Sequence, residues 1–472
     1  MAKRMSEDSR TEWQKICLVG MPYLFVAALF ACFACNNLLT RGMFMDGLIY
    51  TTCAANLASG QGDLWHLSFT PTQLSQFYEH PPLMIWMLAA WFRFFGTSMV
   101  AAKAYSVAIL LLAALLMVAI WRRLGYGTAN GWLPLLMLTL IPDVPLGIHN
   151  NYLESTMAVF ILFAVWCELK ADNTLLHLTA GFATAAAFLV KGPTGLFPLV
   201  LPLLLYAFGV RKYSLWRMAA ATFTMLIGLL MPLAALYCLN PDAHDYLTRY
   251  AERQIIGGMH EPVTSRIYVL TVFLSRAAIP LVCSVALLLG AFLRKGASWC
   301  PTSRHLQVAC MLLTLALCGS MPMMLSTKQR AFYLLTIYPI VALSAAVLAE
   351  PLIRAGNSLL HGRKAATATA FVFAAAIALN ALHYGRPGRD AQLLTDMDII
   401  APHLAPEETL AIPHSLADNF SLHGYYYFYH RHALDAEAPH AHLLTAQAPA
   451  DSLHYRQIPL ATAQYRLYER CD

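Results

Sequence analysis

Two acidic residues stand beside apolar runs, where a carboxylate can act as a proton acceptor. Asp46 lies in GMFMDGLIY, and Glu154 lies in HNNYLESTM. A carboxylate within hydrogen-bond reach of a hydroxyl or amine can take its proton as that group attacks. Each residue also has a structural interpretation, Asp46 as the N-cap of a helix and Glu154 as an acidic residue of a first helical turn. Both are therefore candidate catalytic residues, and the structural alternative stays open for each.

Glutamate and histidine side chains recur in two further segments. Glu79 and His80 precede two prolines in FYEHPPLMIW, and His260 begins a His-Glu-Pro triplet. Carboxylate and imidazole groups bind divalent cations such as zinc, and a metal ion can neutralise a phosphate. Two ligands that are distant in sequence do not define a site. A zinc site at Glu79 and His260 is therefore a hypothesis, and the absence of any metal is its alternative.

Three cations lie close to apolar runs and are suited to a phosphate. They are Lys191 in LVKGPTG, Arg253 in YAERQ and Lys328 in STKQRAFY. Arginine offers a bidentate fork and lysine a point charge, which a lipid-linked phosphate or diphosphate requires. The alternative for both lysines is that they extend to the lipid headgroups.

The sequence contains none of the common soluble-enzyme motifs. There is no GxxxxGK[ST] phosphate loop, no HExxH zinc helix and no GxSxG nucleophile elbow. Chemistry on soluble nucleotides is therefore disfavoured, and we expect no nucleotide cofactor. The net charge of +6 does not indicate a nucleic-acid partner, because the positions of the charges set membrane topology instead.

The elements that position these residues are transmembrane helices. Of the 472 residues, 58% are hydrophobic and 12% are charged, against about 25% charged residues in soluble domains. Several apolar runs reach the roughly 20 residues that a helix needs to cross a bilayer. The expected spans are 17–37, 99–121, 128–147, 151–169, 175–190, 194–210, 218–239, 267–293, 306–325, 331–350 and 365–383.

The distribution of positive charge predicts the orientation of these spans. With the amino terminus in the cytoplasm, the cytoplasmic segments collect half of the lysines and arginines, and the short outer loops are poorer in cations. The first apolar run lacks a small-residue cleavage site, so we expect it to be retained as a span. An odd number of spans then places the carboxy-terminal tail outside.

The outer segments are expected to contain interfacial helices at 46–57 and 82–95, and an amphipathic helix within 240–266. From 384 the composition changes, with short alternating runs and an aromatic SLHGYYYFYHRH tract, which predicts a small mixed α/β domain. The fold class is thus an all-α polytopic membrane protein with about 11 transmembrane helices. The predicted domains are 1–383 in the membrane and 384–472 outside it.

The order of these motifs resembles a known family. An acidic residue follows the first span, PPL begins an interfacial helix, an acidic residue enters span four, KGP follows span five, and His-Glu-Pro and K-x-x-x-x-YLL come later. This series is similar to the C-type membrane glycosyltransferases related to protein O-mannosyltransferases and lipid A aminoarabinose transferase. It covers roughly residues 17–350.

The resemblance implies transfer of a sugar from a polyprenyl-phosphate donor to an acceptor on the periplasmic face of a bacterial inner membrane. The acceptor class stays open between lipid A, another lipid, a glycan and a protein. Asp46 matches the acidic position proposed as catalytic, and Glu154 matches a second acidic position. Glu79 and His260 match zinc ligands of the aminoarabinose transferase, and Lys191 matches the KGP lysine.

The sequence departs from the family at two positions. Gly47 stands where the family often has glutamate, and His80 stands where it often has lysine. A titrating group at His80 thus replaces a permanent charge as a donor-phosphate contact. Two other functions stay open: a transporter or flippase for a lipid-linked sugar, which predicts broken helices near the bilayer midplane, and an enzyme resembling O-antigen ligase.

Overall fold

The computed structural model describes residues 2–170, 172–257, 264–295, 301–356, 363–448 and 454–471. The chain forms two compact units. The first contains Met1–Cys35, Ala108–Ile148 and Leu153–Leu382, and the second contains Asn36–Val107, His149–Tyr152 and His383–Asp472. Each is described by itself. The predicted domain boundary at 383 stays a prediction.

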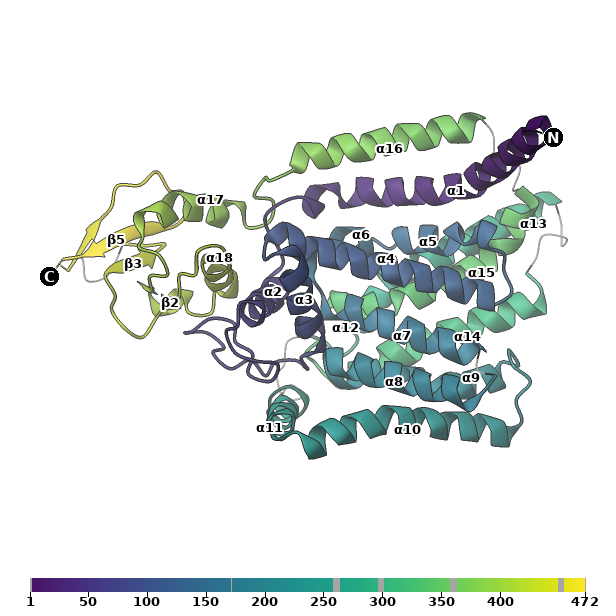
Figure 1. The fold of residues 1–472 in the computed structure, drawn as a ribbon, viewed down its shortest axis with the longest axis horizontal. Helices are drawn as coiled ribbons and strands as arrows, with labels where there is room; N and C mark the ends of the chain where they lie inside the picture. Colours follow the sequence, from purple (N-terminus) through teal and green to yellow (C-terminus); the bar gives the residue numbers. More distant parts are fainter. Residues whose placement is uncertain are drawn as a thin grey trace. The chain divides into compact units, whose positions relative to one another are not determined.

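The first unit is a bundle of long helices (Figure 1). Three helices, α1, α4 and α16, also have residues in the second unit. The bundle's α-helices are α1 (Ala2–Leu38), α4 (Met99–Arg123), α5 (Trp132–Thr139), α6 (Asp143–Gly147), α7 (Leu153–Lys170), α8 (Thr174–Lys191), α9 (Leu201–Ala207), α10 (Leu215–Leu239), α11 (Pro241–Tyr250), α12 (Tyr268–Val272), α13 (Ile279–Lys295), α14 (Ser303–Ser320), α15 (Tyr338–Gly356) and α16 (Arg363–His383).

Short 3-10 and π segments interrupt or extend these helices. The 3-10 segments are η1 (Thr128–Asn130), η2 (Ile148–Asn150), η3 (Gly192–Gly195), η4 (Phe197–Val200), η9 (Met321–Leu325) and η10 (Ala331–Thr336). The π-helical segments are η5 (Ala251–Ile256) and η7 (Phe273–Ala277). Because such segments break the regular helical hydrogen-bond pattern, several expected spans are not single helices.

Among the described residues, six helices are long and apolar enough to cross a bilayer, or up to eight if each bent pair is one span. The chain is thus a multi-pass membrane protein, but the expected number of 11 spans is not confirmed. Helix α7, which is not among the six, carries Glu154, Glu168 and Lys170. Such charged residues lower the mean hydropathy of a helix.

Prolines and bends account for other departures from the expected spans. The run 128–147 folds as two helical segments bent by 72°, and 267–293 folds as two bent by 44°. The run 194–210 begins as two 3-10 segments with prolines in their first turns. Proline removes a helical hydrogen bond and clashes with the preceding turn, so these runs cannot continue as one helix.

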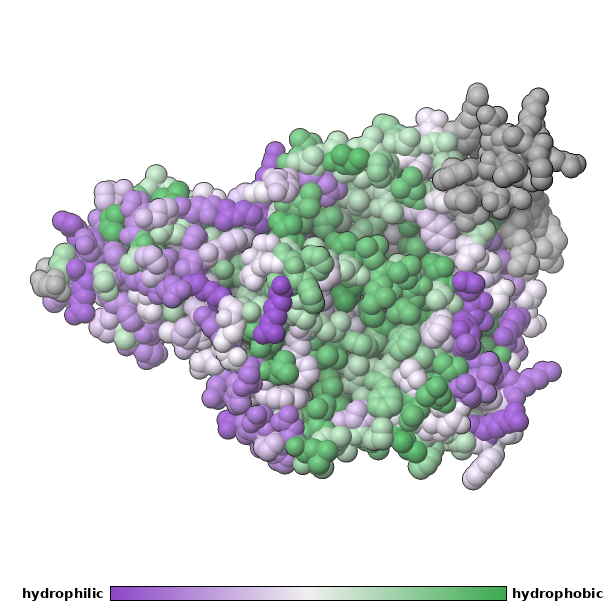
Figure 2. Space-filling model, in the orientation of Figure 1, coloured by the Kyte–Doolittle hydropathy of each residue, from purple (hydrophilic) through white to green (hydrophobic). Residues whose placement is uncertain are grey.

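The hydrophobic surface of the first unit coincides with its long helices. Figure 2 shows a broad hydrophobic area over the bundle, with hydrophilic side chains near the loop that joins α9 and α10. Exposed apolar side chains on α10 include Phe223 and Leu230, which are 64% and 58% exposed. Apolar side chains on the outside of a bundle are expected of helices in contact with lipid.

The second unit contains the two helices expected at the membrane interface. They are α2 (Met45–Ala58) and α3 (Leu83–Phe95), and they pack against each other. Helix α3 ends at Gly96, whose φ of 80° favours glycine. The predicted helices at 46–57 and 82–95 are therefore confirmed.

The tail also belongs to the second unit and has the expected mixed α/β structure. Its helical segments are α17 (Ala391–Ile400), η12 (Ala401–His403), η13 (His414–Leu416) and α18 (Phe420–His430). Its strands are β1 (Leu410–Ala411), β2 (Leu434–Asp435), β3 (His442–Thr445), β4 (Tyr455–Gln457) and β5 (Arg466–Arg470).

The five strands form one mixed sheet in the order β2-β1-β3-β5-β4. Strand β1 pairs in parallel with β2 and β3, whereas β5 pairs antiparallel with β3 and β4. The aromatic tract forms α18, and its side chains Tyr425 and Tyr426 are fully buried. Helix α18 packs against α2.

Candidate active site

Two of the expected site residues form a buried ion pair in the first unit. Lys191, the last residue of α8, donates a hydrogen bond to the carboxylate of Glu154 in the first turn of α7. Their side chains are 9% and 2% exposed. The lysine therefore does not extend to a lipid surface, and Glu154 has the first-turn position expected of its structural alternative. A buried charge requires such a partner because desolvation is costly.

Aromatic rings complete the surroundings of Lys191. Its Nζ lies 3.8 Å from the ring centroid of Tyr333 and 5.5 Å from that of Phe332. Both rings come from η10, and their π faces attract a cation. The ammonium group is therefore held between a carboxylate and two aromatic faces.

The turn after Lys191 fits closely against helix α11. Gly192 has a φ of 74°, and a Cβ at this position would lie 2.0 Å from the hydroxyl of Tyr250. Burial raises the pKa of Tyr250, so its hydroxyl stays neutral. The glycine of the KGP motif thus allows α11 to pack against the end of α8.

The other expected cations, Arg253 and Lys328, lie on segments that follow or contact α11 and η5. Arg253 belongs to η5, which follows α11 directly, and Lys328 Nζ lies 3.5 Å from Oε1 of the adjacent Gln254. Buried Gln329 holds the lysine loop by donating to the carbonyl oxygens of Arg266 and Ser326. The first unit therefore gathers three of the four expected phosphate-binding cations on neighbouring segments.

A partly buried acidic residue near these elements was not expected from the sequence. Asp143 accepts hydrogen bonds from Arg276 and, at 2.6 Å, from the hydroxyl of Tyr338. Arg276 belongs to the π-helical segment η7, and such segments frequently occur at functional sites. The sequence signal for this pair was one acidic residue within the expected span 128–147 and one basic residue within the expected span 267–293. Charged residues within apolar spans indicate such pairing.

In the second unit, Asp46 lies in the first turn of α2 and is half-buried. Phe44 is the N-cap, so the N-cap interpretation of Asp46 is wrong. The backbone N–H of Phe44 instead donates to Oδ1 of Asn150 at 2.8 Å. Asp46 therefore remains a candidate for chemistry rather than a cap.

The departure at Gly47 has a steric explanation. A Cβ at this position would lie 1.7 Å from the carbonyl oxygen of Asn150. The glutamate that the family often carries there therefore cannot be accommodated, because the carbonyl belongs to the backbone. The glycine of the Asp46-Gly47 pair therefore permits the close approach of the Asn150 backbone to α2.

The stretch that contains Glu79 and His80 packs beside α2. The rings of His80 and Tyr50 meet edge to face at 5.6 Å, and the ring of Phe77 lies 6.3 Å from that of Tyr50. Tyr50 follows Asp46 by four residues, so the two share one face of the helix. In the second unit Asp46 and His80 thus lie along the same face of α2. Both Glu79 and His80 are half-buried.

The structure supports no complete metal site within its described residues. It contains no group of three or more His, Cys, Asp and Glu side chains that could hold a metal ion, whereas catalytic zinc sites use three protein ligands. His260, the second expected zinc ligand, lies outside the described residues. The Glu79 and His260 site stays a prediction.

Several solved structures share this fold. The chain matches ArnT from Cupriavidus metallidurans bound to undecaprenyl phosphate with a TM-score of 0.67 and 16% identity, over 94% of this chain and 97% of that chain. The apo state of the same protein gives a TM-score of 0.63 and 16% identity over the same shares. AglB from Archaeoglobus fulgidus, in complex with an inhibitory peptide and a dolichol-phosphate, gives 0.50 and 10% identity, over 90% of this chain and 65% of that chain.

No protein-family model and no curated protein matches the sequence. At sequence identities of 16% and 10%, the similarity to these solved structures shows the fold. ArnT is a lipid A aminoarabinose transferase, so the fold expected from the order of the motifs is confirmed.

Proposed function

We propose that this chain is a membrane glycosyltransferase that moves a sugar from a polyprenyl-phosphate donor to an acceptor on the outer face of a bacterial inner membrane. The observation that carries the proposal is the buried contact between Lys191 and Glu154 within an ArnT-like fold. A lysine flanked by aromatic rings at the end of a transmembrane helix is energetically costly to bury. Binding of a phosphate is a functional reason for this position.

The donor phosphate in this proposal binds Lys191, Arg253 and Lys328, with His80 as a further contact. A glycosyl phosphate departs as an anion, so it needs positive charge more than a proton. In the structure Glu154 is the charge partner of Lys191. A phosphate that takes over the ammonium group therefore frees a carboxylate that was previously paired.

The transfer itself requires one nucleophile and one base. The acceptor hydroxyl or amine attacks the anomeric carbon, a bond forms there, and the bond from that carbon to the phosphate oxygen breaks with its electron pair on the phosphate. Asp46 is the proposed base and accepts the acceptor's proton. Glu154 is the proposed second acidic residue of the reaction.

The acceptor and the metal belong to the same proposal. Lipid A, another lipid, a glycan or a protein fits the reaction equally, since each offers a nucleophile. Zinc at Glu79 and His260 would add positive charge near a phosphate, and no step above depends on it. The proposed orientation places the tail domain in the periplasm.

Purified protein in liposomes with an undecaprenyl-phosphate-linked monosaccharide and candidate acceptors tests the proposal. We expect transfer by the wild type and a loss of at least about 100-fold in Asp46→Asn, because general base catalysis contributes about 10²- to 10⁴-fold. Transfer at the wild-type rate by a normally folded Asp46→Asn sample would exclude the base role. Glu407→Gln, which changes an exposed carboxylate of the tail, is the matched control.

A transporter for lipid-linked sugars is the second candidate, and the two bent spans favour it. It predicts movement of the donor across the bilayer without cleavage of the sugar–phosphate bond. Separate measurement of donor sidedness and of free undecaprenyl phosphate distinguishes the two functions. Release of undecaprenyl phosphate that requires an acceptor supports the transferase.

A further inference from the structure

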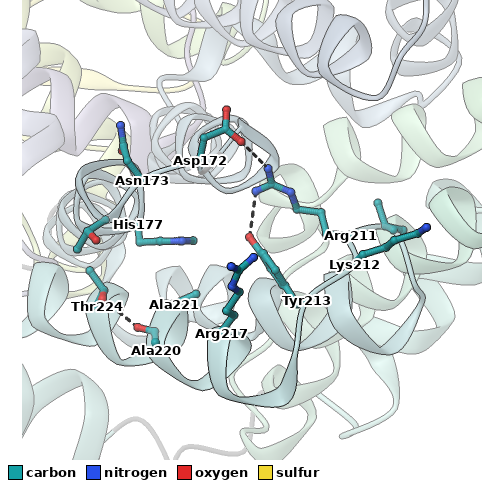
Figure 3. A pocket seen from close by; sticks show the side chains of 12 residues that line it. Asp172, Asn173, His177, Arg211, Lys212, Tyr213, Arg217, Ala220, Ala221 and Thr224 are labelled. Carbon is teal, nitrogen blue, oxygen red and sulfur yellow. Dashed lines mark hydrogen bonds and ion pairs between the residues drawn. The ribbon is translucent and has the colours of Figure 1, made fainter.

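A polar cleft opens at the end of α8 that is opposite to Lys191. Its volume is 690 Å³, and it lies between the first turns of α8 and α10 and the loop that precedes α10. Figure 3 shows the ring of His177 and the guanidinium group of Arg217 pointing into it from two sides. His177 and Lys191 are separated by 14 residues of one helix, or roughly 21 Å. The cleft is therefore distinct from the cluster around Lys191.

Close packing farther along the two helices explains why a cleft forms here. A Cβ added to Gly181 of α8 would lie 2.2 Å from the carbonyl oxygen of Met225, and one added to Gly228 of α10 would lie 2.3 Å from that of Leu178. The two backbones meet at these glycines. Nearer the loops, small Ala220 contributes to the lining instead of a large side chain, so a space remains between the helices.

The lining carries more positive than negative charge. Arg211, Lys212 and Arg217 face one carboxylate, that of Asp172. Arg211 is committed to the protein, since it donates to Asp172 at 2.9 Å and to Tyr213 at 3.0 Å. Among the residues that the structure describes, Lys212 and Arg217 have no side-chain hydrogen bond or ion pair.

A buried carboxylate lies behind His177 at the edge of the cleft. Nδ1 of His177 lies 2.9 Å from the fully buried carboxylate of Glu168. Because this carboxylate is buried and hydrogen-bonded to His177, it is not a direct partner of Lys212 or Arg217. An anion in the cleft would therefore meet two available cations and the ordered guanidinium group of Arg211.

Large exposed apolar side chains lie close in sequence to residues that line the cleft. Leu175, Leu215, Trp216 and Phe223 are 66%, 63%, 82% and 64% exposed, and all belong to α8 or α10. Tryptophan and leucine next to arginine and lysine are typical of helices at the level of lipid headgroups. A soluble anion would not use these apolar groups, whereas a lipid would contact them with its acyl chains.

We propose that this cleft binds the phosphate headgroup of an anionic phospholipid, with Arg217 and Lys212 as the direct contacts and Arg211 as an ordered third cation. In the predicted orientation the lipid belongs to the cytoplasmic leaflet. The site does not depend on the proposed transferase reaction. It attaches the α8 and α10 end of the bundle to one leaflet through charge and acyl contacts together.

Native mass spectrometry of the full chain, released from micelles that contain phosphatidylglycerol or phosphatidylcholine, tests this site. We expect wild-type protein to retain phosphatidylglycerol in preference to phosphatidylcholine. Arg217→Gln with Lys212→Gln is expected to lower phosphatidylglycerol retention about tenfold or more, since two charge-assisted contacts are lost. Arg122→Gln, an exposed arginine in the last turn of α4, is the matched control and should leave retention unchanged.

Three results would overturn the proposal. They are equal retention of the two lipids, unchanged retention in the double variant, and an equal loss in Arg122→Gln. Inorganic phosphate that displaces phosphatidylglycerol at micromolar concentration would assign the cleft to a soluble anion and would also overturn it. Normal elution of each variant in size-exclusion chromatography establishes that folding is not the cause, and transferase assays of the same samples keep this test separate from the proposed function.

Discussion

Replacing Glu154 or Lys191 singly should destabilise the protein far more than replacing both. The two side chains are 2% and 9% exposed, so either single change leaves a buried charge without its partner. Removal of one member of a buried pair costs about 3 to 5 kcal/mol. We therefore expect Glu154→Gln and Lys191→Met each to lower the apparent unfolding temperature by roughly 5 to 10 °C.

The double variant removes both charges and leaves no uncompensated ion. Its unfolding temperature should lie within a few degrees of the wild type, because a buried pair contributes little over an apolar replacement. Asp172→Asn, in an exposed pair with Arg211 in which the aspartate is 72% exposed, should cost less than about 1 kcal/mol. This control separates burial from the mere loss of an ion pair.

The same variants test whether Lys191 holds a phosphate. Undecaprenyl phosphate should raise the unfolding temperature of the wild type by mass action, and this rise should disappear in Lys191→Met. In Glu154→Gln it should persist or increase, because the competing carboxylate is gone. If the two single effects simply add in the double variant, or if Lys191→Met keeps the full rise, the reasoning is refuted.

Further predictions concern both units. Gly47→Ala should reduce stability or yield of folded protein, because its Cβ would lie 1.7 Å from the carbonyl of Asn150; alanine at Gly20, which has open space, should have no such effect in the same assay. Asp143→Asn should cost about 1 to 2 kcal/mol in thermal unfolding, since its ion pair is partly exposed, and an unchanged unfolding temperature would contradict this. Burial lowers the pKa of His423 from 6.5 to about 4, so the second unit should lose about 3 kcal/mol of stability as the pH falls from about 6.5 to about 4. His423→Leu should flatten this pH profile, and an unaltered profile would assign the effect to another group.

Local sequence signals were sufficient for the interfacial helices. Two prolines precede α3, and Gly96 follows it with positive φ, so both ends were specified by residues next to them. The apolar pattern likewise predicted α2 and the long spans. In such segments the backbone conformation depends on nearby residues, which a single sequence reveals.

Pairings between distant residues were not predictable in the same way. Lys191 and Glu154 are 37 residues apart, and their contact depends on the register in which α7 and α8 pack. Asp143 and Arg276 are 133 residues apart, and each was hidden within an apolar run. The break of the 128–147 run near Pro142 depended on two opposing tendencies. Proline interrupts a helix, whereas the apolar length of the run favours one continuous span.

Two buried side-chain pairs join α7 to α8, and they give a structural reason for the charged residues in these helices. Glu154 binds Lys191 at one end and Glu168 binds His177 at the other, and the pairs are 14 residues apart on both helices. Equal spacing on antiparallel neighbours fixes a single register, because a shift by one residue would break both buried pairs at once. Glu154 therefore has a positioning role whether or not it also takes part in transfer. In the proposed reaction, a phosphate that takes over the ammonium group of Lys191 would release the carboxylate of Glu154 as a proton acceptor, so donor binding at Lys191 and any chemistry at Glu154 would be coupled.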